Sequence, residues 1–491
     1  MSNVKQSAKY LFLSTLFSKG ISFIGSIILA KLLFPEDYGY LLIAMVFTGF
    51  IQILVSVGFE TYYLQETIES EEHERIILNV TYYLRFILNT LLFIFQIIVS
   101  YWVEDYYDEE IIGSLLRIFA LNYLLIAVGQ INTFILRKKI LFKPEATSNL
   151  VRDIVGMIFK VTFAFMGLGA LSFAFGTVIA NIAKLFVILH YQKFVPSRIE
   201  WDPKLFKKIW HFGIHSFIGG IGMFFSTYID KMFIASFFSK DTIGYYYFAH
   251  SQAQQFSAYL IQPQSSLVLS YSATYKTVVD MLKDNLLRIA YLISAFSIPV
   301  LTFLFIYADV FFNMIFGDKW DASVPLFQLF IVDSVILITT FPLSSILTAF
   351  GKPELNSKII VYRFIFLAVI LGVAGYVKST IFIYGLSFII LSMIFTLIKS
   401  HISMKNLNSS LWVYLKNIRF PFILMLLNGL LFVGLKANIG NNYISVGSSI
   451  VASIFLNVLM TKLFDYKRFL EVLGLILNSN NKIYKTLHKF N

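Results

Sequence analysis

The chain has 491 residues and no cysteine, which excludes structural disulfides, thiolate metal sites and cysteine nucleophiles. Charged residues are also scarce, at 14%, whereas a soluble domain has about 25%. Hydrophobic residues make up 57% of the chain, and its mean hydropathy is +0.73. The apolar runs are too long and too closely spaced for soluble domains. The composition therefore predicts an integral membrane protein.

A membrane-spanning helix needs about 20 mostly apolar residues, and the chain contains about fourteen such runs. The predicted fold class is therefore an all-α integral membrane protein. The loops between the runs are short, so we expect the function to lie within the bilayer. The expected spans lie near residues 10–33, 39–60, 78–103, 111–136, 147–168, 170–192, 212–238, 243–270, 289–313, 325–350, 358–377, 379–400, 420–437 and 442–463.

Lysine and arginine predict the orientation, because cytoplasmic loops are enriched in them. The side that carries both termini and the even-numbered loops is the more basic one, with clusters such as Arg137-Lys138-Lys139. The opposite loops hold single residues, such as Lys31 and Lys240. We therefore expect both termini to be cytoplasmic. This placement also explains the net charge of +12 without nucleic acid, which is not an expected partner.

A weak internal repeat relates two parts of the chain about 205 residues apart, an interval of six predicted spans. An even number of spans gives both copies the same orientation, which predicts two six-helix lobes in a parallel repeat, a transporter design. The matching residues are Ala30, Gly39-Tyr40 and Ala44 in one copy, and Ala235, Gly244-Tyr245 and Ala249 in the other. The expected organisation is an N-lobe (1–192), a cytoplasmic linker (193–211), a C-lobe (212–401), two extra helices (402–463) and a cytoplasmic amphipathic tail (464–491).

Several basic residues fall inside predicted spans, where a charge costs at least about 2.5–3.5 kcal/mol and normally faces an interior cavity. Asp153 is nearly the only intramembrane carboxylate of the first lobe, so its excess positive charge predicts an anionic ligand. The alternative is that residues near helix ends, such as Arg152, Lys184 and Lys231, extend to the interface. The candidate substrate-binding residues of this cationic cavity are Lys19, Arg85, Arg117, Arg152, Lys160 and Arg363.

Polar residues at helical spacing give further candidates, because positions i, i+3, i+4 and i+7 share one face of a helix. Such stripes occur in the first, seventh and eighth predicted spans. They are expected to line a central cavity, although helix packing through small and hydrogen-bonding residues is the alternative. The candidate cavity-lining residues are Ser22, Ser26, Thr227, His250 and Gln254, and the candidates for ion coupling are Asp230 and His250.

Recognised catalytic motifs are missing from the sequence. It contains no P-loop, no GxSxG nucleophile elbow and no HExxH metal motif. We therefore predict that the protein is not an enzyme and that it needs no cofactor and no metal.

Three segments carry a family resemblance. Residues 27–39, IILAKLLFPEDYG, resemble the first-loop signature of the polysaccharide transporter branch of the multidrug/oligosaccharidyl-lipid/polysaccharide (MOP) exporter superfamily, with Lys31 where arginine is usual. Asp230 with the segment Gly244-Tyr245-Tyr246 and Ala249 resembles the start of that family's second lobe. The segment from Phe316 to Trp320, FGDKW, resembles its loop after the ninth helix.

This resemblance implies two six-helix bundles that form a V around a central cationic cavity. It also implies a multi-pass flippase of the bacterial cytoplasmic membrane that works by alternating access. The implied substrates are undecaprenyl-diphosphate-linked oligosaccharide repeat units for lipopolysaccharide O-antigen, capsule or related polymers. The implied partners are this lipid-linked substrate, membrane lipids, the polysaccharide polymerase and other polysaccharide-assembly proteins.

Two alternative functions remain open from the sequence. A cation-coupled multidrug exporter of the same superfamily should have acidic residues facing its cavity, and this chain has few of them. A membrane polysaccharide polymerase should have a sizeable loop to hold its acceptor, and the predicted loops are short.

Overall fold

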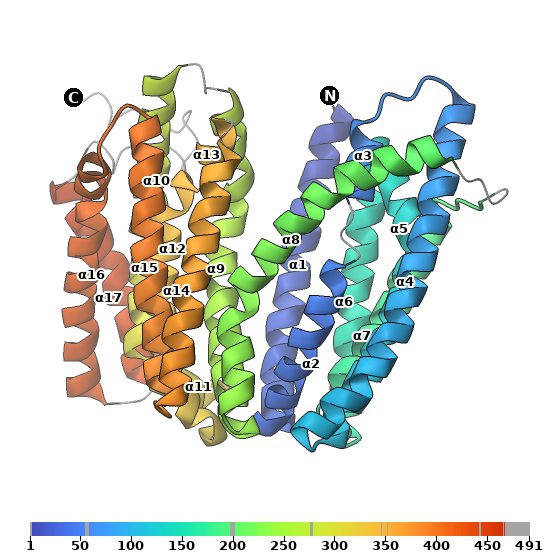
Figure 1. Cartoon of the computed structure of the whole chain (residues 1–491). Coiled ribbons are helices and arrows are strands. Elements are labelled where there is room, and N and C mark those ends of the chain that lie inside the picture. Colours follow the sequence, from blue (N-terminus) through green and yellow to red (C-terminus); the bar gives the residue numbers. More distant parts are fainter. Residues whose placement is uncertain are drawn as a thin grey trace. The chain divides into compact units, whose positions relative to one another are not determined.

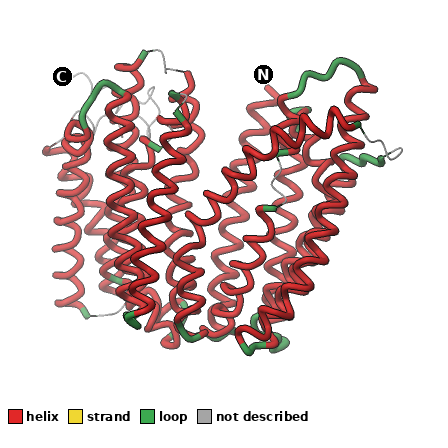
Figure 2. Tube along the Cα trace, in the orientation of Figure 1, coloured by secondary structure: helices red, strands yellow, loops and turns green. Residues whose placement is uncertain are grey.

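The computed structural model describes residues 2–54, 58–196, 202–274, 278–344, 346–350, 352–440, 443–464 and 466. Within these ranges every regular element is a helix and no strand occurs (Figures 1 and 2), which confirms the all-α class. The predicted amphipathic tail lies outside the described residues, except for Phe464 and Tyr466. Residues 197–201 of the predicted linker also lie outside them.

The helices follow one another with short connections (Figure 1). The first nine are α1 (Ser2–Leu32), α2 (Pro35–Ile53), α3 (Phe59–Gln65), α4 (Glu71–Tyr107), α5 (Glu110–Lys138), α6 (Phe142–Phe165), α7 (Leu171–Tyr191), α8 (Pro203–Phe237) and α9 (Lys240–Thr274). The later ones are α10 (Val279–Ile306), α11 (Ala308–Ile315), η1 (Asp318–Ser323), α12 (Val324–Thr340), η2 (Phe341–Leu343), α13 (Ile346–Ala349), α14 (Pro353–Tyr376), α15 (Ile381–Asn406), α16 (Leu411–Ile439) and α17 (Tyr443–Phe464).

Ten helical segments of the described chain are long and apolar enough to cross a membrane. They lie in α1, α4, α5, α7, α10, the stretch Asp318–Leu343, α14, α15, α16 and α17. The protein is therefore a multi-pass membrane protein, and the count of about fourteen spans stays a prediction. The helix α6 is not among the ten, and its 24 residues include the charged side chains Arg152, Asp153 and Lys160.

The chain divides into two compact units. Unit 1 comprises Met1–Tyr247 and Leu371–Ile381, and unit 2 comprises Phe248–Ile370 and Phe382–Asn491. The first turns of α9 thus belong to unit 1 and the rest of α9 to unit 2. The predicted lobes and linker were drawn from the helix count, and their boundaries stay a prediction.

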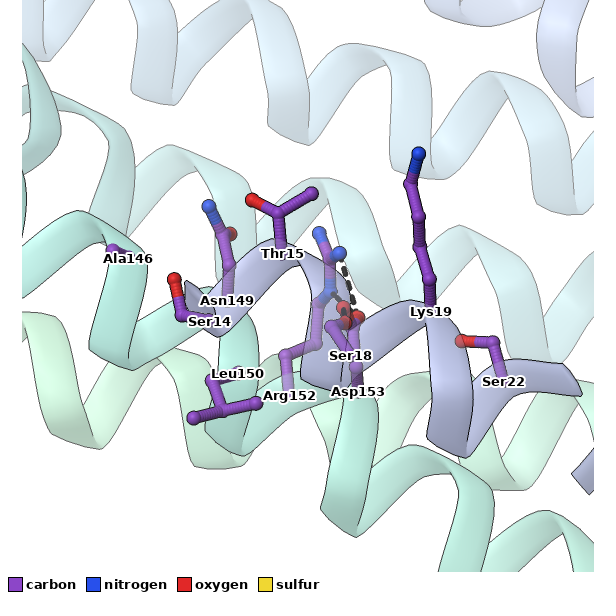
Figure 3. A pocket seen from close by; sticks show the side chains of 10 residues that line it. All are labelled: Ser14, Thr15, Ser18, Lys19, Ser22, Ala146, Asn149, Leu150, Arg152 and Asp153. Atoms are coloured by element: carbon purple, nitrogen blue, oxygen red, sulfur yellow. Dashed lines mark hydrogen bonds and ion pairs between the residues drawn. The ribbon is translucent and has the colours of Figure 1, made fainter. Parts of the chain in front are cut away.

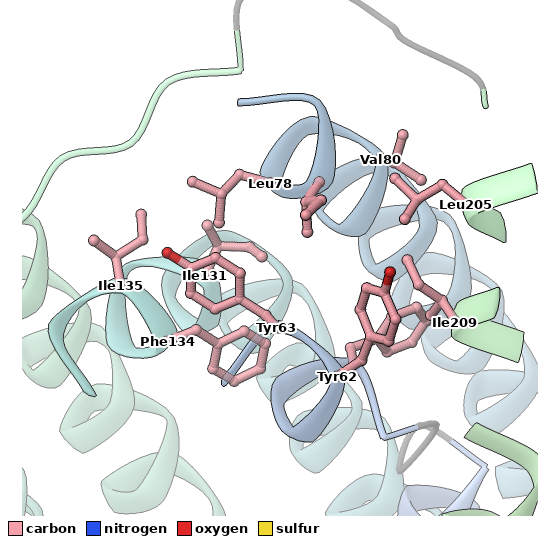
Figure 4. Packing of buried hydrophobic residues seen from close by; sticks show 11 residues of the cluster. Tyr62, Tyr63, Leu78, Val80, Ile131, Phe134, Ile135, Leu205 and Ile209 are labelled. Atoms are coloured by element: carbon pink, nitrogen blue, oxygen red, sulfur yellow. The ribbon is translucent and has the colours of Figure 1, made fainter. Parts of the chain in front are cut away.

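In unit 1 the helix α6 packs against α1 on one side and α7 on another, and α4 packs against α5. The short helix α3 is held by an apolar cluster in which Tyr62 lies beside Ile209 of α8 (Figure 4). The amino group of Lys138 donates hydrogen bonds to the carbonyl oxygens of Tyr63 and Glu66, at 2.6 and 2.9 Å, near the C-terminal end of α3. The cluster consists of Phe59, Tyr62, Tyr63, Ile77, Leu78, Val80, Ile131, Phe134, Ile135, Leu205 and Ile209.

Two glycines allow the beginnings of α2 and α9 to cross at very short range. A Cβ on Gly39 would lie 2.1 Å from the carbonyl oxygen of Lys240, and a Cβ on Gly244 would lie 1.7 Å from that of Pro35. Each glycine is the fifth residue of its own helix and meets the first residue of the other. These are the two glycines of the predicted sequence repeat, and here they make equivalent contacts.

In unit 2 the helix α10 packs against α12 and α16, and α17 packs against α16. The segment FGDKW supplies an aromatic core between α9, α11 and α12. Trp320 is fully buried and stacks on Phe248 with ring centroids 3.8 Å apart, while Phe316 meets the same ring edge-on at 4.9 Å. Between them Gly317 has φ +94°, a backbone conformation that favours glycine. The motif is therefore accounted for by packing.

Candidate functional site

A polar pocket of about 300 Å³ lies between α1 and α6 in unit 1 (Figure 3). It occurs where two helices of a membrane protein pack together, a position at which polar side chains face other helices instead of lipid. Its lining residues are Ser14, Thr15, Ser18, Lys19, Ser22, Ala146, Asn149, Leu150, Arg152 and Asp153.

Hydroxyl groups from α1 form one wall of the pocket. Ser14, Ser18 and Ser22 recur every four residues, so they follow one face of the helix, and Thr15 and Lys19 lie beside them. The residues belong to the segment Ser14–Leu32, which is long and apolar enough to span a membrane. The predicted candidates Lys19 and Ser22 line the pocket. Ser26 does not line this pocket. Its hydroxyl donates to the carbonyl oxygen of Phe23 on the same helix, at 2.8 Å, and its cavity-lining role elsewhere stays a prediction.

An ion pair from α6 forms the opposite wall. Nε and Nη2 of Arg152 both donate to Oδ1 of Asp153, at 2.8 and 2.7 Å. The hydroxyl of Ser18 donates to Oδ2 of the same carboxylate, which joins α1 to α6. The side chain of Arg152 is 38% exposed and that of Asp153 is 23% exposed.

The pocket has an excess of positive charge, because two cations and one carboxylate line it. Figure 3 shows the amino group of Lys19, the guanidinium of Arg152 and the hydroxyl of Thr15 directed toward the same side of the two helices. Cationic and hydroxyl donors arranged in this way suit the oxygens of a phosphate or diphosphate. Hydroxyl and amide groups, such as that of Asn149, can also bind the hydroxyl groups of a sugar.

Arg85, a predicted ligand of the cavity, lies elsewhere in unit 1. Its side chain is buried between the rings of Phe59 and Phe134, whose centroids are 5.4 and 5.3 Å from the guanidinium carbon. It also donates a hydrogen bond to Oε1 of Gln130. The partners of Arg85 thus come from α3 and α5, and Arg85 does not line the pocket of Figure 3.

Arg117 also lies apart from the pocket. Its guanidinium pairs with Glu104 of α4 at 2.8 Å and lies over the ring of Tyr101 at 5.0 Å. This ion pair joins α5 to α4, and it was not predicted from the sequence. The positive charge of Arg117 is therefore balanced by a carboxylate of the protein.

Lys160 belongs to α6, one of the two helices that form the pocket, but it does not line the pocket. It follows Asp153 by seven residues and so shares its face of α6. Its backbone and side chain pack against α7. A Cβ on Gly176 of α7 would lie 2.9 Å from the backbone nitrogen of Lys160 and 2.4 Å from its side-chain Cγ. A role of Lys160 in binding stays a prediction.

Arg363 belongs to unit 2, in α14, where its guanidinium carbon lies 5.5 Å from the ring centroid of Phe388 in α15. His250 is buried, and its ring meets that of Phe330 edge-on at 4.8 Å. Gln254, one turn further along α9, is exposed. The substrate-binding role of Arg363, the cavity-lining roles of His250 and Gln254, and ion coupling through His250 stay predictions.

Asp230 and Lys231 form a buried ion pair in unit 1, with a distance of 3.3 Å. The hydroxyl of Tyr246 donates to Oδ2 of Asp230 at 2.8 Å, and the amino group of Lys231 donates to the carbonyl oxygen of Thr227 at 2.9 Å. Lys231 is only 6% exposed. The charge of Asp230 has local partners, and ion coupling through Asp230 stays a prediction, as does the cavity-lining role of Thr227.

Seven pocket residues were not among the predicted site residues: Ser14, Thr15, Ser18, Ala146, Asn149, Leu150 and Asp153. A signal for the serines was available, because Ser14, Ser18 and Ser22 are spaced four apart. The contributions of Asn149 and Asp153 depend on the contact between α1 and α6, which are more than 100 residues apart along the chain. No local pattern reveals that contact.

Comparison with known proteins decides the family. Residues 28–325 match the family described as "Polysaccharide biosynthesis protein", which covers more than half of the chain. The chain belongs to this family. The predicted resemblance is thereby confirmed.

One curated relative of the chain is the teichuronic acid biosynthesis protein TuaB of Bacillus subtilis. The two are 22% identical over 72% of each chain. Among solved structures, the lipid II flippase MurJ in an inward closed conformation matches with a TM-score of 0.75 and 16% identity, over 93% of this chain and 99% of that one. An inward-facing MATE multidrug resistance transporter of the MOP superfamily matches with a TM-score of 0.62 and 13% identity, over 79% of this chain and 94% of that one. The chain therefore has the fold shared by these transporters.

Proposed function

We propose that this protein is a flippase for undecaprenyl-diphosphate-linked oligosaccharide repeat units. It moves them from the cytoplasmic to the outer leaflet of the bacterial cytoplasmic membrane for the synthesis of a cell-surface polysaccharide, such as O-antigen or capsule. Membership of the polysaccharide biosynthesis family and the fold shared with a lipid II flippase support this proposal. The observation that carries it is the pocket between α1 and α6, which is lined by two cationic side chains, Lys19 and Arg152, and by one carboxylate, Asp153.

In this proposal the pocket receives the diphosphate, while the lipid tail remains in the bilayer. Two six-helix lobes that rock about a central cationic cavity give alternating access, and both termini are cytoplasmic. The free energy of one elementary charge changes by about 2.3 kcal/mol when it crosses a membrane potential of 100 mV. Outward movement of a roughly divalent anion across an inside-negative membrane therefore gains about 4–5 kcal/mol. The membrane potential therefore favours such a movement.

The rival function is export of a cationic drug, and the fold shared with a MATE transporter is the observation in its favour. A cationic ligand should be bound by carboxylates. In the pocket the single carboxylate, Asp153, is already held by Arg152 and Ser18. The electrostatic balance of the pocket thus favours an anionic substrate over a cationic one.

The test replaces both pocket cations, in the variant Lys19→Gln/Arg152→Gln, in a strain that depends on this protein for its surface polysaccharide. We expect the surface polymer to fall at least tenfold, since each lost charge-assisted hydrogen bond costs about 1.5–3 kcal/mol. The variant Lys31→Gln is the matched control, because Lys31 lies exposed at the end of the same helix. Immunoblots of the membrane fraction confirm equal amounts of protein.

Normal surface polysaccharide in the double variant would refute the assignment of the site. Single repeat units on the cell surface without long polymer would point to a polymerase, because repeat units would still cross the membrane. Raised drug sensitivity with unchanged polysaccharide would point to a drug exporter.

A further inference from the structure

Asp153, a residue of α6, accepts hydrogen bonds from both of the helices that form the pocket. Its Oδ1 accepts two hydrogen bonds from the Arg152 guanidinium, and its Oδ2 accepts one from the hydroxyl of Ser18. The carboxylate therefore has partners on both oxygens within the protein. Arg152 is the more exposed member of the pair, 38% against 23%, so the guanidinium is the group that a ligand reaches more easily.

The pairing leaves part of the guanidinium available. Arginine has five N–H donors, and Asp153 uses one on Nε and one on Nη2. A phosphate bound to the other donors of Arg152 would lie within a few ångströms of the Asp153 carboxylate. Like charges at that distance repel strongly where the surroundings are less polar than water. An anionic ligand and Asp153 therefore oppose each other at Arg152.

We propose that Asp153 is a built-in counter-ion of Arg152 that competes with the anionic group of the substrate and so limits how tightly the pocket holds it. This inference rests on the proposed flippase function and concerns the same pocket. A transporter must release what it binds, and an Arg152 guanidinium without this counter-ion would hold a diphosphate more firmly and release it more slowly. Asp153 also supplies charge balance to Arg152, because an unpaired charge within a membrane protein is costly.

The competing explanation is that Asp153 only orients Arg152 and joins α6 to α1. The two explanations predict changes of opposite sign. If Asp153 only positions Arg152, its neutralisation weakens the binding of an anionic ligand. If Asp153 competes with the ligand, its neutralisation strengthens that binding and slows release.

The experiment compares the full-length wild-type protein with the variant Asp153→Asn, both purified in detergent. Asparagine keeps the size of the side chain. Its amide oxygen can still accept from Arg152, while its amide nitrogen takes the place of Oδ2 and can donate to the hydroxyl oxygen of Ser18. The probe is farnesyl-diphosphate-linked glucose, and its dissociation constant is measured by titration calorimetry at one fixed low salt concentration. We expect the dissociation constant to fall about tenfold, as the loss of one nearby like charge implies. We also expect slower flipping at saturating probe in vesicles.

A neutral probe and a second pair of variants serve as controls. Farnesyl glucoside has no phosphate, so its affinity should be equal in the wild type and in Asp153→Asn. The variants Arg152→Gln and Arg152→Gln/Asp153→Asn form an independent comparison if Asp153→Asn alone fails to fold. The double variant should bind the charged probe about tenfold more tightly than Arg152→Gln. In this double variant the net charge of the side chains that line the pocket is the same as in the wild type, because one cation and one carboxylate are both neutralised.

Unchanged or weaker binding of the charged probe by Asp153→Asn would overturn the inference, and so would equal binding by the two Arg152 variants. The proposed function would survive either result if Lys19→Gln still loses affinity for the charged probe. It would fail, together with this inference, if the wild-type protein bound the charged and neutral probes equally. The two failures are therefore distinguishable.

Discussion

Basic residues that look alike in the sequence have different partners in the structure. Arg85 is enclosed by aromatic rings and Gln130, Arg117 pairs with Glu104, and Arg152 shares Asp153 with Ser18. The sequence predicted that these charges lie inside helices, because hydropathy and helix periodicity are local properties. It could not predict their partners, since most of these come from other helices. Of the six predicted substrate-binding residues, Lys19 and Arg152 line the pocket.

Arg85 provides a prediction about stability. Because the side chain is buried between two rings, Arg85→Ala removes cation–π contacts worth about 2 kcal/mol in a desolvated site and leaves a cavity. We expect a clearly lower melting temperature in detergent, measured by intrinsic fluorescence. The matched control is Arg75→Ala, which removes a partly exposed pair with Glu72 and should change stability by less than about 1 kcal/mol. An unchanged melting temperature with lost binding of a diphosphate probe would instead make Arg85 a ligand of the substrate.

At the scale of the elements, helix spacing predicted much of the α1 wall of the pocket. Ser22 was expected to line a cavity and Lys19 to bind the substrate, and both line the pocket. Ser26 was expected on the same stripe, but the pocket ends before it. The boundary could not be predicted because it depends on which side chains of α6 meet α1, and beyond Ser22 the side chain of Met157 packs against Gly25. The glycine repeat was visible in the sequence, whereas the contact between its two copies required the structure.

The crossing of α2 and α9 yields a prediction for Gly244→Ala. The new methyl group would overlap the carbonyl oxygen of Pro35, 1.7 Å away, so the backbone of one helix must move. Overpacking of this kind costs about 1–3 kcal/mol. We expect a lower melting temperature in detergent. Gly434→Ala in α16 is the control, since its Cβ meets open space and alanine favours helix by up to about 1 kcal/mol. Equal melting temperatures for the two variants would show that the crossing is not tightly packed.

At the scale of the whole molecule, composition sufficed to predict a multi-pass all-α membrane protein, and the short motifs sufficed to predict the family. Both predictions are confirmed. The number of spans stays a prediction, because ten helical segments of the described chain are long and apolar enough to span a membrane, whereas about fourteen were expected. The expected span at 147–168 corresponds to α6, which carries the charges of Arg152, Asp153 and Lys160 and is not among the ten. Two of these charged residues, Arg152 and Asp153, line the pocket on which the proposed function depends.

Transport of a lipid-linked oligosaccharide by purified protein is the most direct test. The protein is reconstituted into vesicles with a fluorescently labelled polyprenyl-diphosphate oligosaccharide, and a membrane-impermeant quencher reports the labelled lipid in the outer leaflet. We predict that the wild-type protein exchanges the labelled lipid between leaflets many times faster than protein-free vesicles do. Lys19→Gln/Arg152→Gln should lower that rate at least tenfold. Equal rates for the wild type and this variant would contradict the account.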